Sequence, residues 1–410
     1  MKKIVWSIFL HIYQPPGWPK AIIDRVAKES YRPILNILKK RPNLRITLNI
    51  NGSLTEQLKK HGYQDIIKNI VALAKNQQIE FTDSAQYHVI LALMPNDEIK
   101  RQIQLNHKVN SKAFGPVFQP TGFFMPEMCY GKKLAGLLDQ LGYHWTILDE
   151  IAYQGKLGKV SFDRKYKIKG TDLQVIFRNR LISDLFHTKE MKTKKDFFQS
   201  LKKDRHSRNY LITAFDGENL GHHNPQMDKI FASIIDSGKF QTVTISELLN
   251  SYNRQSTVDP LPSSWASWEE NFADNIAYPL WQNPDNRIHQ LQWRLTNLVL
   301  KAIRKNKKNK DYKKARKALD KALMSDQYWW ASGCPWWEPK IIIQGAKNLI
   351  KILYILHEVP AETREQAERI LMDIKKMIDF VTKTGLINQI RKNYLHKEAL
   401  SRVFSGKVVK

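Results

Sequence analysis

Short apolar runs alternate with amphipathic stretches along the first 260 residues. Continuous apolar runs of this length predict buried β-strands, and apolar residues spaced three or four apart predict helices. Strands are therefore expected at 4–10, 44–50, 79–82, 122–127, 144–148, 210–215 and 241–245, with a strand pair at 160–169 and 173–177. Helices are expected at 22–40, 54–58, 66–74, 96–113, 132–141 and 197–203. Strands that alternate with helices predict a parallel sheet.

Polar side chains repeatedly stand at the end of a predicted strand or just beyond it. They are His11, Asn49, His88, Glu127, Asp149 and Asp216. In an α/β barrel the carboxyl ends of the strands meet at one mouth, where the functional groups lie. The first part of the chain is therefore predicted to be a barrel or barrel-like ring with one polar mouth.

The strand pattern disappears from about residue 284 onward. Helical spacing continues at 288–304, 312–324, 341–356, 362–382 and 385–394. A loop rich in Trp and Pro, at 261–284, connects the two parts. We expect an incomplete seven-stranded (β/α) barrel at 1–260 and an all-helical domain at 261–410 that contributes to the substrate cleft.

The chain is basic, with 66 Lys and Arg against 39 Asp and Glu and a formal net charge of +27. Such a charge suits a polyanionic partner, but the basic residues are spread along the chain without a nucleic-acid-binding motif, so we do not expect nucleic acid. Two cysteines only, Cys129 and Cys334, indicate a reducing compartment, and we expect a cytoplasmic protein. The N-terminal apolar run has no cleavage site after it. No stretch approaches the roughly 20 apolar residues of a membrane span. The oligomeric state stays open.

Two carboxyl groups at predicted strand ends, Glu127 and Asp216, both neighbour aromatic residues. Paired carboxyl groups carry out glycoside hydrolysis, and aromatic rings stack on sugar faces. The alternative is that each acid forms a structural ion pair with one of the many arginines. For Asp216, which precedes Gly217, a surface turn is a further alternative.

Five segments resemble, in order, the signature regions of glycoside hydrolase family 57, an α-glucan-active family with an incomplete seven-stranded barrel. They are HIYQP at 11–15, IEFT at 79–82 with LALMP at 91–95, GFFMPE at 122–127, FDGENLG at 215–221 and DQYWWAS at 326–332. The third and fourth segments together are highly specific. Tyr13 departs from the family pattern, which usually has a second histidine there. His222 and His223 depart as well, because many members have other residues after the fourth region.

The resemblance implies a retaining mechanism with Glu127 as nucleophile and Asp216 as general acid/base, without a metal or cofactor. It also implies that the substrate is contacted by His11, Gln14, Glu80, His88, Asp184, Glu218, Asp326, Trp329 and Trp330. A general acid must be protonated before it acts, and Glu218 is a candidate for the negative charge that would raise the pKa of Asp216. A solvent-facing turn residue is the alternative for Glu218, and packing of the helical domain is the alternative for the tryptophans.

Several functions stay open beside an α-amylase-like hydrolase. A 4-α-glucanotransferase uses the same residues and differs only in whether a sugar hydroxyl or water completes the reaction. An inactive glucan-binding protein and a polyanion-binding protein are alternatives of another class. A metal-dependent polysaccharide deacetylase needs two histidines four positions apart, and none of the 12 histidines has such a neighbour.

Overall fold

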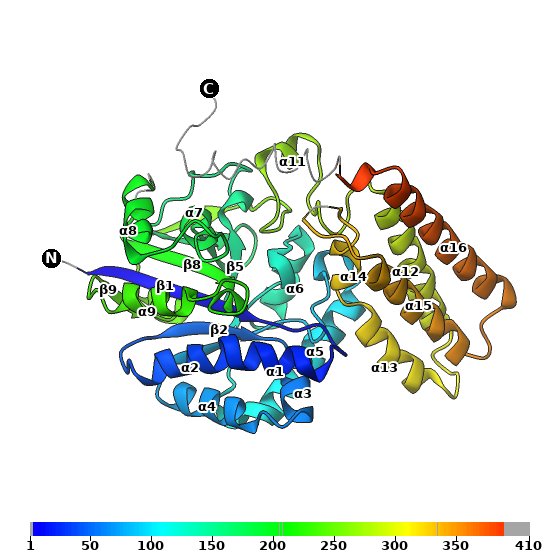
Figure 1. Ribbon diagram of the computed structural model, residues 1–410, viewed down its shortest axis with the longest axis horizontal. Coiled ribbons are helices and arrows are strands. Elements are labelled where there is room, and N and C mark those ends of the chain that lie inside the picture. The colour runs from blue at the N-terminus through cyan, green and yellow to red at the C-terminus, as the bar shows by residue number, and fades with distance from the viewer. Residues whose placement is uncertain (1–2, 205, 207, 334, 389–410) are drawn as a thin grey trace. The chain divides into compact units, whose positions relative to one another are not determined.

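The computed structural model describes residues 3–388 apart from 205, 207 and 334. The chain divides into two compact units, Met1–Glu269 and Glu270–Lys410 (Figure 1). The predicted helix at 385–394 lies outside the described residues from residue 389 onward.

One curled sheet forms the centre of the first unit. Its strands run in the order β10-β6-β7-β5-β4-β3-β2-β1-β8, and β9 pairs with the first half of β1. All neighbouring strands are parallel except β6 and β7. The strands are β1 (Ile4–Ile12), β2 (Ile46–Ile50), β3 (Ile79–Asp83), β4 (Gly122–Phe123), β5 (Trp145–Asp149), β6 (Lys165–Ile168), β7 (Gln174–Arg178), β8 (Tyr210–Asp216), β9 (Phe240–Val243) and β10 (Gln255–Val258).

The sheet curls far enough for β7 to approach β8, which lies at the end of the strand order. The backbone N–H of Asn179, just after β7, donates to the carbonyl of Ile212 at 2.9 Å. The Arg178 guanidinium donates to the carbonyl of Ala214 at 3.1 Å. Together with the helical second unit, this confirms the predicted fold class of an incomplete barrel followed by helices.

Helices lie along the strands of the first unit (Figure 1). A π-helical turn, Ala27–Tyr31, joins α1 to α2 within the stretch that was predicted as one helix. The helices are α1 (Lys20–Val26), α2 (Arg32–Lys39), α3 (Gly52–Lys60), α4 (Gln64–Lys75), α5 (Asn96–Phe114), α6 (Lys132–Gln140), α7 (Arg180–Asp184), α8 (Lys194–Lys203), α9 (Met227–Ile235) and α10 (Ile245–Asn250).

The predicted strand at 122–127 is shorter than expected, because the chain leaves the sheet after Phe123 and enters a turn that contains Pro126. Helix α10 is capped by Thr244, whose side chain accepts the hydrogen bond from the Glu247 N–H.

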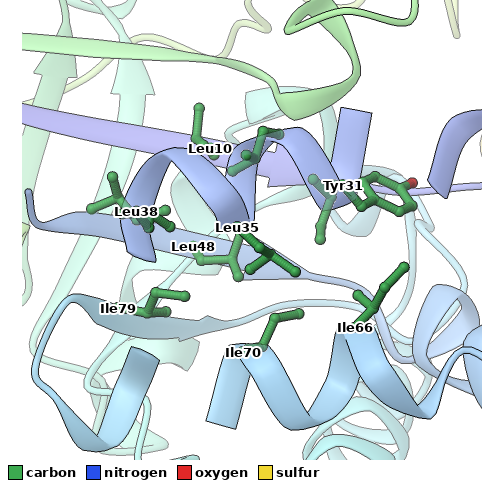
Figure 2. Close-up of a pocket in the computed structure, with 11 residues that line it drawn as sticks. Leu10, Tyr31, Leu35, Leu38, Leu48, Ile66, Ile70 and Ile79 are labelled. Atoms are coloured by element: carbon green, nitrogen blue, oxygen red, sulfur yellow. The ribbon is translucent and has the colours of Figure 1, made fainter. Parts of the chain in front are cut away.

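A small apolar cavity of about 20 Å³ lies between strands β1–β3 and the helices α2 and α4 (Figure 2). Its walls are aliphatic side chains, including Leu48 and Ile70, and the ring of Tyr31. A cavity with such walls offers a water molecule no partner and stays dry. The Tyr31 hydroxyl points away from the neighbouring aliphatic groups in Figure 2, toward the end of the strands.

The second unit is helical. Helix α12 packs against α15 and α16, and α13 packs against α15. Among residues 3–388, no helix that the structure describes combines the length and the apolar character needed to cross a membrane. The helices are α11 (Glu269–Ala273), at the junction of the units, α12 (Arg287–Lys305), α13 (Tyr312–Ala322), α14 (Asp326–Trp329), α15 (Pro339–Ile355) and α16 (Ala361–Lys383).

Candidate active site

The strand register brings several of the predicted site residues to one level of the barrel. His11 is paired with Asp216 on one side and with Asn49 on the other. Asn49 in turn is paired with Thr82, and His88 follows shortly after β3. Because these strands are parallel, the polar residues at their carboxyl ends lie at the same mouth.

Asp216 and Glu218 form a pair of carboxyl groups at this mouth. Burial raises the pKa of Asp216 to about 6, against the opposing charges of His187 and Arg178. Burial, and then the charge of Asp216, raise the pKa of Glu218 to about 8. The pair therefore holds one proton near neutral pH. Glu218 is 3% exposed, which rules out a solvent-facing turn residue.

One oxygen of Glu218 accepts three hydrogen bonds. Its Oε1 lies 2.6 Å from the Tyr31 hydroxyl, 3.1 Å from the Tyr13 N–H and 3.3 Å from Gln14 Nε2. Tyr13 and Gln14 directly follow β1, so this strand fixes two of the donors. Gln14 was predicted to contact substrate, and the structure places its amide on Glu218.

Glu127 lies in a tight turn just beyond β4. Its φ of 60° and that of Met128, 49°, are left-handed, which is strained for residues with a Cβ. A segment at 263–265 holds the turn: Tyr130 N–H donates to the Ser263 carbonyl at 2.8 Å, and Trp265 N–H to the Glu127 carbonyl at 3.1 Å. The Trp265 indole N–H donates to Glu127 Oε2 at 2.7 Å. Side chain and backbone of Glu127 are thus fixed by one segment.

A chain of hydrogen bonds sets the tautomers of His11 and His88. His11 Nδ1 lies 2.8 Å from Asn49 Oδ1, an acceptor because Asn49 Nδ2 donates to Thr82 Oγ1. The proton of His11 is therefore on Nδ1, and His11 Nε2 accepts from His88 Nε2 at 3.1 Å. His88 Nδ1 then carries a lone pair, 3.7 Å from Glu127 Oε1. Burial lowers the pKa of His11 to about 4, and that of His88 well below its usual value, so both rings are neutral.

Buried charges surround Asp149, at the end of β5. Its carboxylate accepts from Arg178 Nε at 2.5 Å and pairs with Arg180 Nη2 at 2.6 Å. Burial raises the pKa of Asp149, but the two arginines outweigh it and hold the pKa below its usual value. Arg178 Nη1 also pairs with Asp184 at 3.0 Å, and its guanidinium lies 5.6 Å from the centre of the Trp265 ring. This network therefore braces Trp265 and places Asp184, a predicted substrate contact, beside Arg178.

His206 supports the same region. It bonds to Asp204 through Nδ1, and its Nε2 lies 2.8 Å from Glu150 Oε2. Burial opposes protonation, but the two carboxylates raise the pKa of His206 to about 9. The other oxygen of Glu150 accepts from the Arg180 N–H at 2.8 Å, so His206 helps to fix the chain at Arg180.

Four of the predicted site residues are not among these contacts. Glu80 lies near the amino end of β3, where its Oε2 accepts from Thr47 Oγ1 at 2.8 Å and from the Ile245 N–H at 3.0 Å, at the start of α10. It is therefore an anchor for that helix rather than part of the mouth. Asp326, Trp329 and Trp330 belong to the second unit.

An aromatic cluster occupies the second unit after α14. The rings of Trp329 and Trp330 lie 5.3 Å apart, and that of Trp336 lies 5.3 Å and 5.0 Å from them. Trp336 is 41% exposed, while Asp326 is buried.

Sequence reasoning missed Trp265 and Tyr31 as site residues. Trp265 lay within the loop at 261–284 that was noted as rich in tryptophan, and Tyr31 lay within the helix predicted at 22–40. His222, singled out as a departure, pairs with Glu29 at 2.6 Å. Within the described residues, no three His, Cys, Asp or Glu side chains are arranged to hold a metal ion.

The mouth of the barrel offers carboxyl groups, neutral imidazoles and an indole. These groups suit acid/base and nucleophilic chemistry on a polyhydroxylated ligand.

Comparison with known proteins places this site in a family. Residues 8–260 match the family model of glycosyl hydrolase family 57. An alpha-amylase of Pyrococcus horikoshii is 29% identical over 152 residues, 37% of this chain and 23% of the relative. A 4-alpha-glucanotransferase of Thermococcus litoralis is 22% identical over 374 residues, 80% of this chain and 54% of the relative. The chain thus matches about half or less of the length of these relatives.

Solved structures extend the likeness in fold. The GH57-type branching enzyme of Pyrococcus horikoshii superimposes with a TM-score of 0.66 at 17% identity, over 95% of this chain and 97% of that one. The glucanotransferase structure from Thermococcus litoralis gives a TM-score of 0.65 at 19% identity, over 86% of this chain and 60% of that one.

Proposed function

Because the chain belongs to glycosyl hydrolase family 57, we propose that it acts on α-glucans by a retaining mechanism, with Glu127 as nucleophile and Asp216 as general acid/base. Asp216 gives its proton to the glycosidic oxygen while the Glu127 carboxylate attacks the anomeric carbon, and the bond to the leaving chain breaks. Water or a sugar hydroxyl then gives its proton to Asp216 and attacks the same carbon, which releases Glu127.

The observation that carries this proposal is the different environment of the two carboxyl groups at one mouth. Glu127 receives a hydrogen bond from the Trp265 indole at 2.7 Å, a donor that suits a carboxylate. Asp216 is in surroundings that raise its pKa to about 6, which suits a proton donor. Two carboxyl groups pushed toward opposite protonation states are the requirement of a retaining glycosidase.

The neutral histidine pair fits a sugar-binding role beside Glu127. With its proton on Nε2 donated to His11, His88 presents Nδ1 as an acceptor for a substrate hydroxyl. In the second unit, Asp326, Trp329 and Trp330 are proposed as further substrate contacts, since a cluster of indole rings suits the flat faces of glucose residues.

Hydrolase and transferase activity both agree with these residues. The product pattern from maltoheptaose decides between them: shorter chains alone mean hydrolysis, and chains longer than the substrate mean transfer. Glu127→Gln and Asp216→Asn should each lower turnover by at least a thousandfold, roughly the effect of losing a covalent nucleophile or a general acid.

A substrate with a good leaving group separates the two roles. With an α-maltosyl fluoride, Asp216→Asn should still release fluoride, because the leaving group needs no proton, whereas Glu127→Gln should not. If Asp216→Asn loses both activities equally while remaining folded, the assignment of the acid is wrong. If the wild type neither cleaves nor transfers any α-glucan, the proposed function is wrong.

A further inference from the structure

The π-helical turn Ala27–Tyr31 packs on the loop that carries Glu218. The Arg32 N–H bonds to the Ala27 carbonyl, five residues back, which is the π pattern. Pro33 has no N–H to offer to Glu29, four residues back, so the regular α-helical bond is missing there. The sequence thus opens the helix at this turn and leaves the Glu29 carbonyl without its regular α-helical donor.

Three consecutive residues of this turn hold the loop at 217–222. Ser30 Oγ donates to the Gly217 carbonyl at 2.9 Å, and the Tyr31 hydroxyl donates to Glu218 Oε1 at 2.6 Å. Glu29 pairs through its side chain with His222 at 2.6 Å. The Glu29 carbonyl also lies close to Gly221: a Cβ at position 221 would be 2.1 Å from the Glu29 carbonyl oxygen.

We propose that the π-helical turn is a positioning element for the acid/base loop, and that Tyr31 acts through Glu218 to shift the shared proton toward Asp216. This inference rests on the proposed function, because it assumes that Asp216 is the proton donor. Tyr31 touches no reacting atom in this scheme and is a positioning residue.

The physical reason lies in the donors on Glu218. A carboxylate that accepts several hydrogen bonds is stabilised in its charged form. Burial and the charge of Glu218 raise the pKa of Tyr31 well above its usual value, so its hydroxyl keeps its proton and always donates. Burial and the charge of Asp216 still leave Glu218 with the higher pKa of the pair, about 8 against about 6, so most of the shared proton rests on Glu218. The donors Tyr31, Tyr13 and Gln14 on Oε1 oppose this preference and raise the fraction of molecules in which Asp216 holds the proton.

Other charged groups face this pair from each neighbouring element. Glu29, itself paired with Arg25, and His222 lie on the side of the π-helical turn. Arg178, at the end of β7, and His187, which follows α7, act on Asp216, and the neutral His11 is its register partner on β1. A change confined to the Tyr31 hydroxyl leaves all of them in place.

Tyr31→Phe is therefore the decisive variant, with Tyr63→Phe as its matched control. Figure 2 shows the Tyr31 ring among aliphatic side chains, and phenylalanine keeps that packing. Tyr63 also donates its hydroxyl to a carboxylate, that of Asp24 on α1, but does not contact Glu218. Loss of the Tyr31 donor makes Glu218 hold the shared proton more strongly, so fewer molecules carry it on Asp216.

The measurement is the pH profile of kcat/KM on maltoheptaose. In Tyr31→Phe the plateau should fall by roughly tenfold and the basic limb should move up by about one pH unit, because Glu218 then holds the shared proton to higher pH, while Tyr63→Phe keeps the wild-type profile. A Tyr31→Phe profile that is lower at every pH but unshifted, in a protein that melts like the wild type, would overturn the inference and leave Tyr31 a structural residue.

Infrared difference spectroscopy of the resting enzyme tests the location of the proton without turnover. The carbonyl band of the protonated carboxyl group should persist to higher pH in Tyr31→Phe than in the wild type, because Glu218 then holds the shared proton more strongly. A band that titrates at the same pH in both proteins overturns the inference, whether or not the enzyme cleaves glucan. An absence of activity on glucan with the expected bands would refute the proposed function alone.

Discussion

The left-handed backbone of Glu127 predicts an unusual response of stability to substitution. Glu127→Ala and Glu127→Gly both remove the carboxylate, and with it the bond from Trp265 and the proximity to His88. The difference between the two variants therefore isolates the backbone. At φ 60° an alanine keeps the strain of the native residue, while glycine adopts the conformation freely.

The magnitude follows from two opposing effects. Relief of left-handed strain favours glycine by about 1–2 kcal/mol. The larger freedom of glycine in the unfolded chain disfavours it by about 0.4–1 kcal/mol. Glu127→Gly should therefore be more stable than Glu127→Ala by roughly 0.5–1 kcal/mol. Each kcal/mol of stability corresponds to about 2–4 °C in Tm.

The assay is thermal or urea unfolding of both variants, with an exposed helix position as control. Lys68 lies in α4, where glycine should be about 1 kcal/mol less stable than alanine. The glycine variant should thus be the more stable one at position 127, and the alanine variant the more stable one at position 68. If glycine is the less stable choice at 127 by the same amount as at 68, the turn is not strained and the reasoning fails.

Three further predictions concern the surroundings of the carboxyl groups. Trp265→Phe should lower kcat/KM about 10–150-fold, the equivalent of roughly 1.5–3 kcal/mol for a hydrogen bond to a charged group. Steady-state kinetics measure this loss, and an unchanged kcat/KM would show that the indole N–H does not act on Glu127. His206→Asn should destabilise the fold by about 3–5 kcal/mol at pH 6, as for a broken buried ion pair. The pKa of His206 is raised to about 9, so its contribution to the free energy of unfolding is complete below about pH 6.5 and is lost as pH rises through about 9. Urea unfolding should therefore show a large difference between the variant and the wild type at pH 6 and a small difference at pH 10. Gly221→Ala should place a methyl group against the Glu29 carbonyl and, at a φ of 110°, cost at least about 2 kcal/mol; a melting temperature equal to the wild type would contradict this close approach.

The sequence predicted the parts of the fold where apolar pattern and packing agree. The strands β1 and β8 are continuous apolar runs buried on both faces, and their polar ends, His11 and Asp216, are register partners. The strand β10 (Gln255–Val258) was not predicted, because three of its four residues are polar and it extends the sheet at an exposed edge.

The site was predictable where strand ends define it and unpredictable where distant segments meet. Glu127 and Asp216 could be named from their positions and the family resemblance, but Trp265 reaches Glu127 from a segment more than a hundred residues away. Glu80 was assigned to the substrate from the family resemblance alone, whereas its contacts lie near the amino end of β3, at the start of α10. Tyr31 fitted a regular helical pattern, which conceals the π-helical turn.

The two carboxyl groups of the mouth are anchored by separate parts of the chain. The segment at 263–265 fixes the turn of Glu127, while the π-helical turn at 27–31 fixes the loop that follows Asp216. Substitutions at distant sites without common partners act nearly additively. Substitutions in one anchor should therefore leave the other nearly unchanged. If Glu127 and Asp216 have the roles proposed above, changes in the π-helical turn alter protonation of the leaving chain while the geometry of attack is kept.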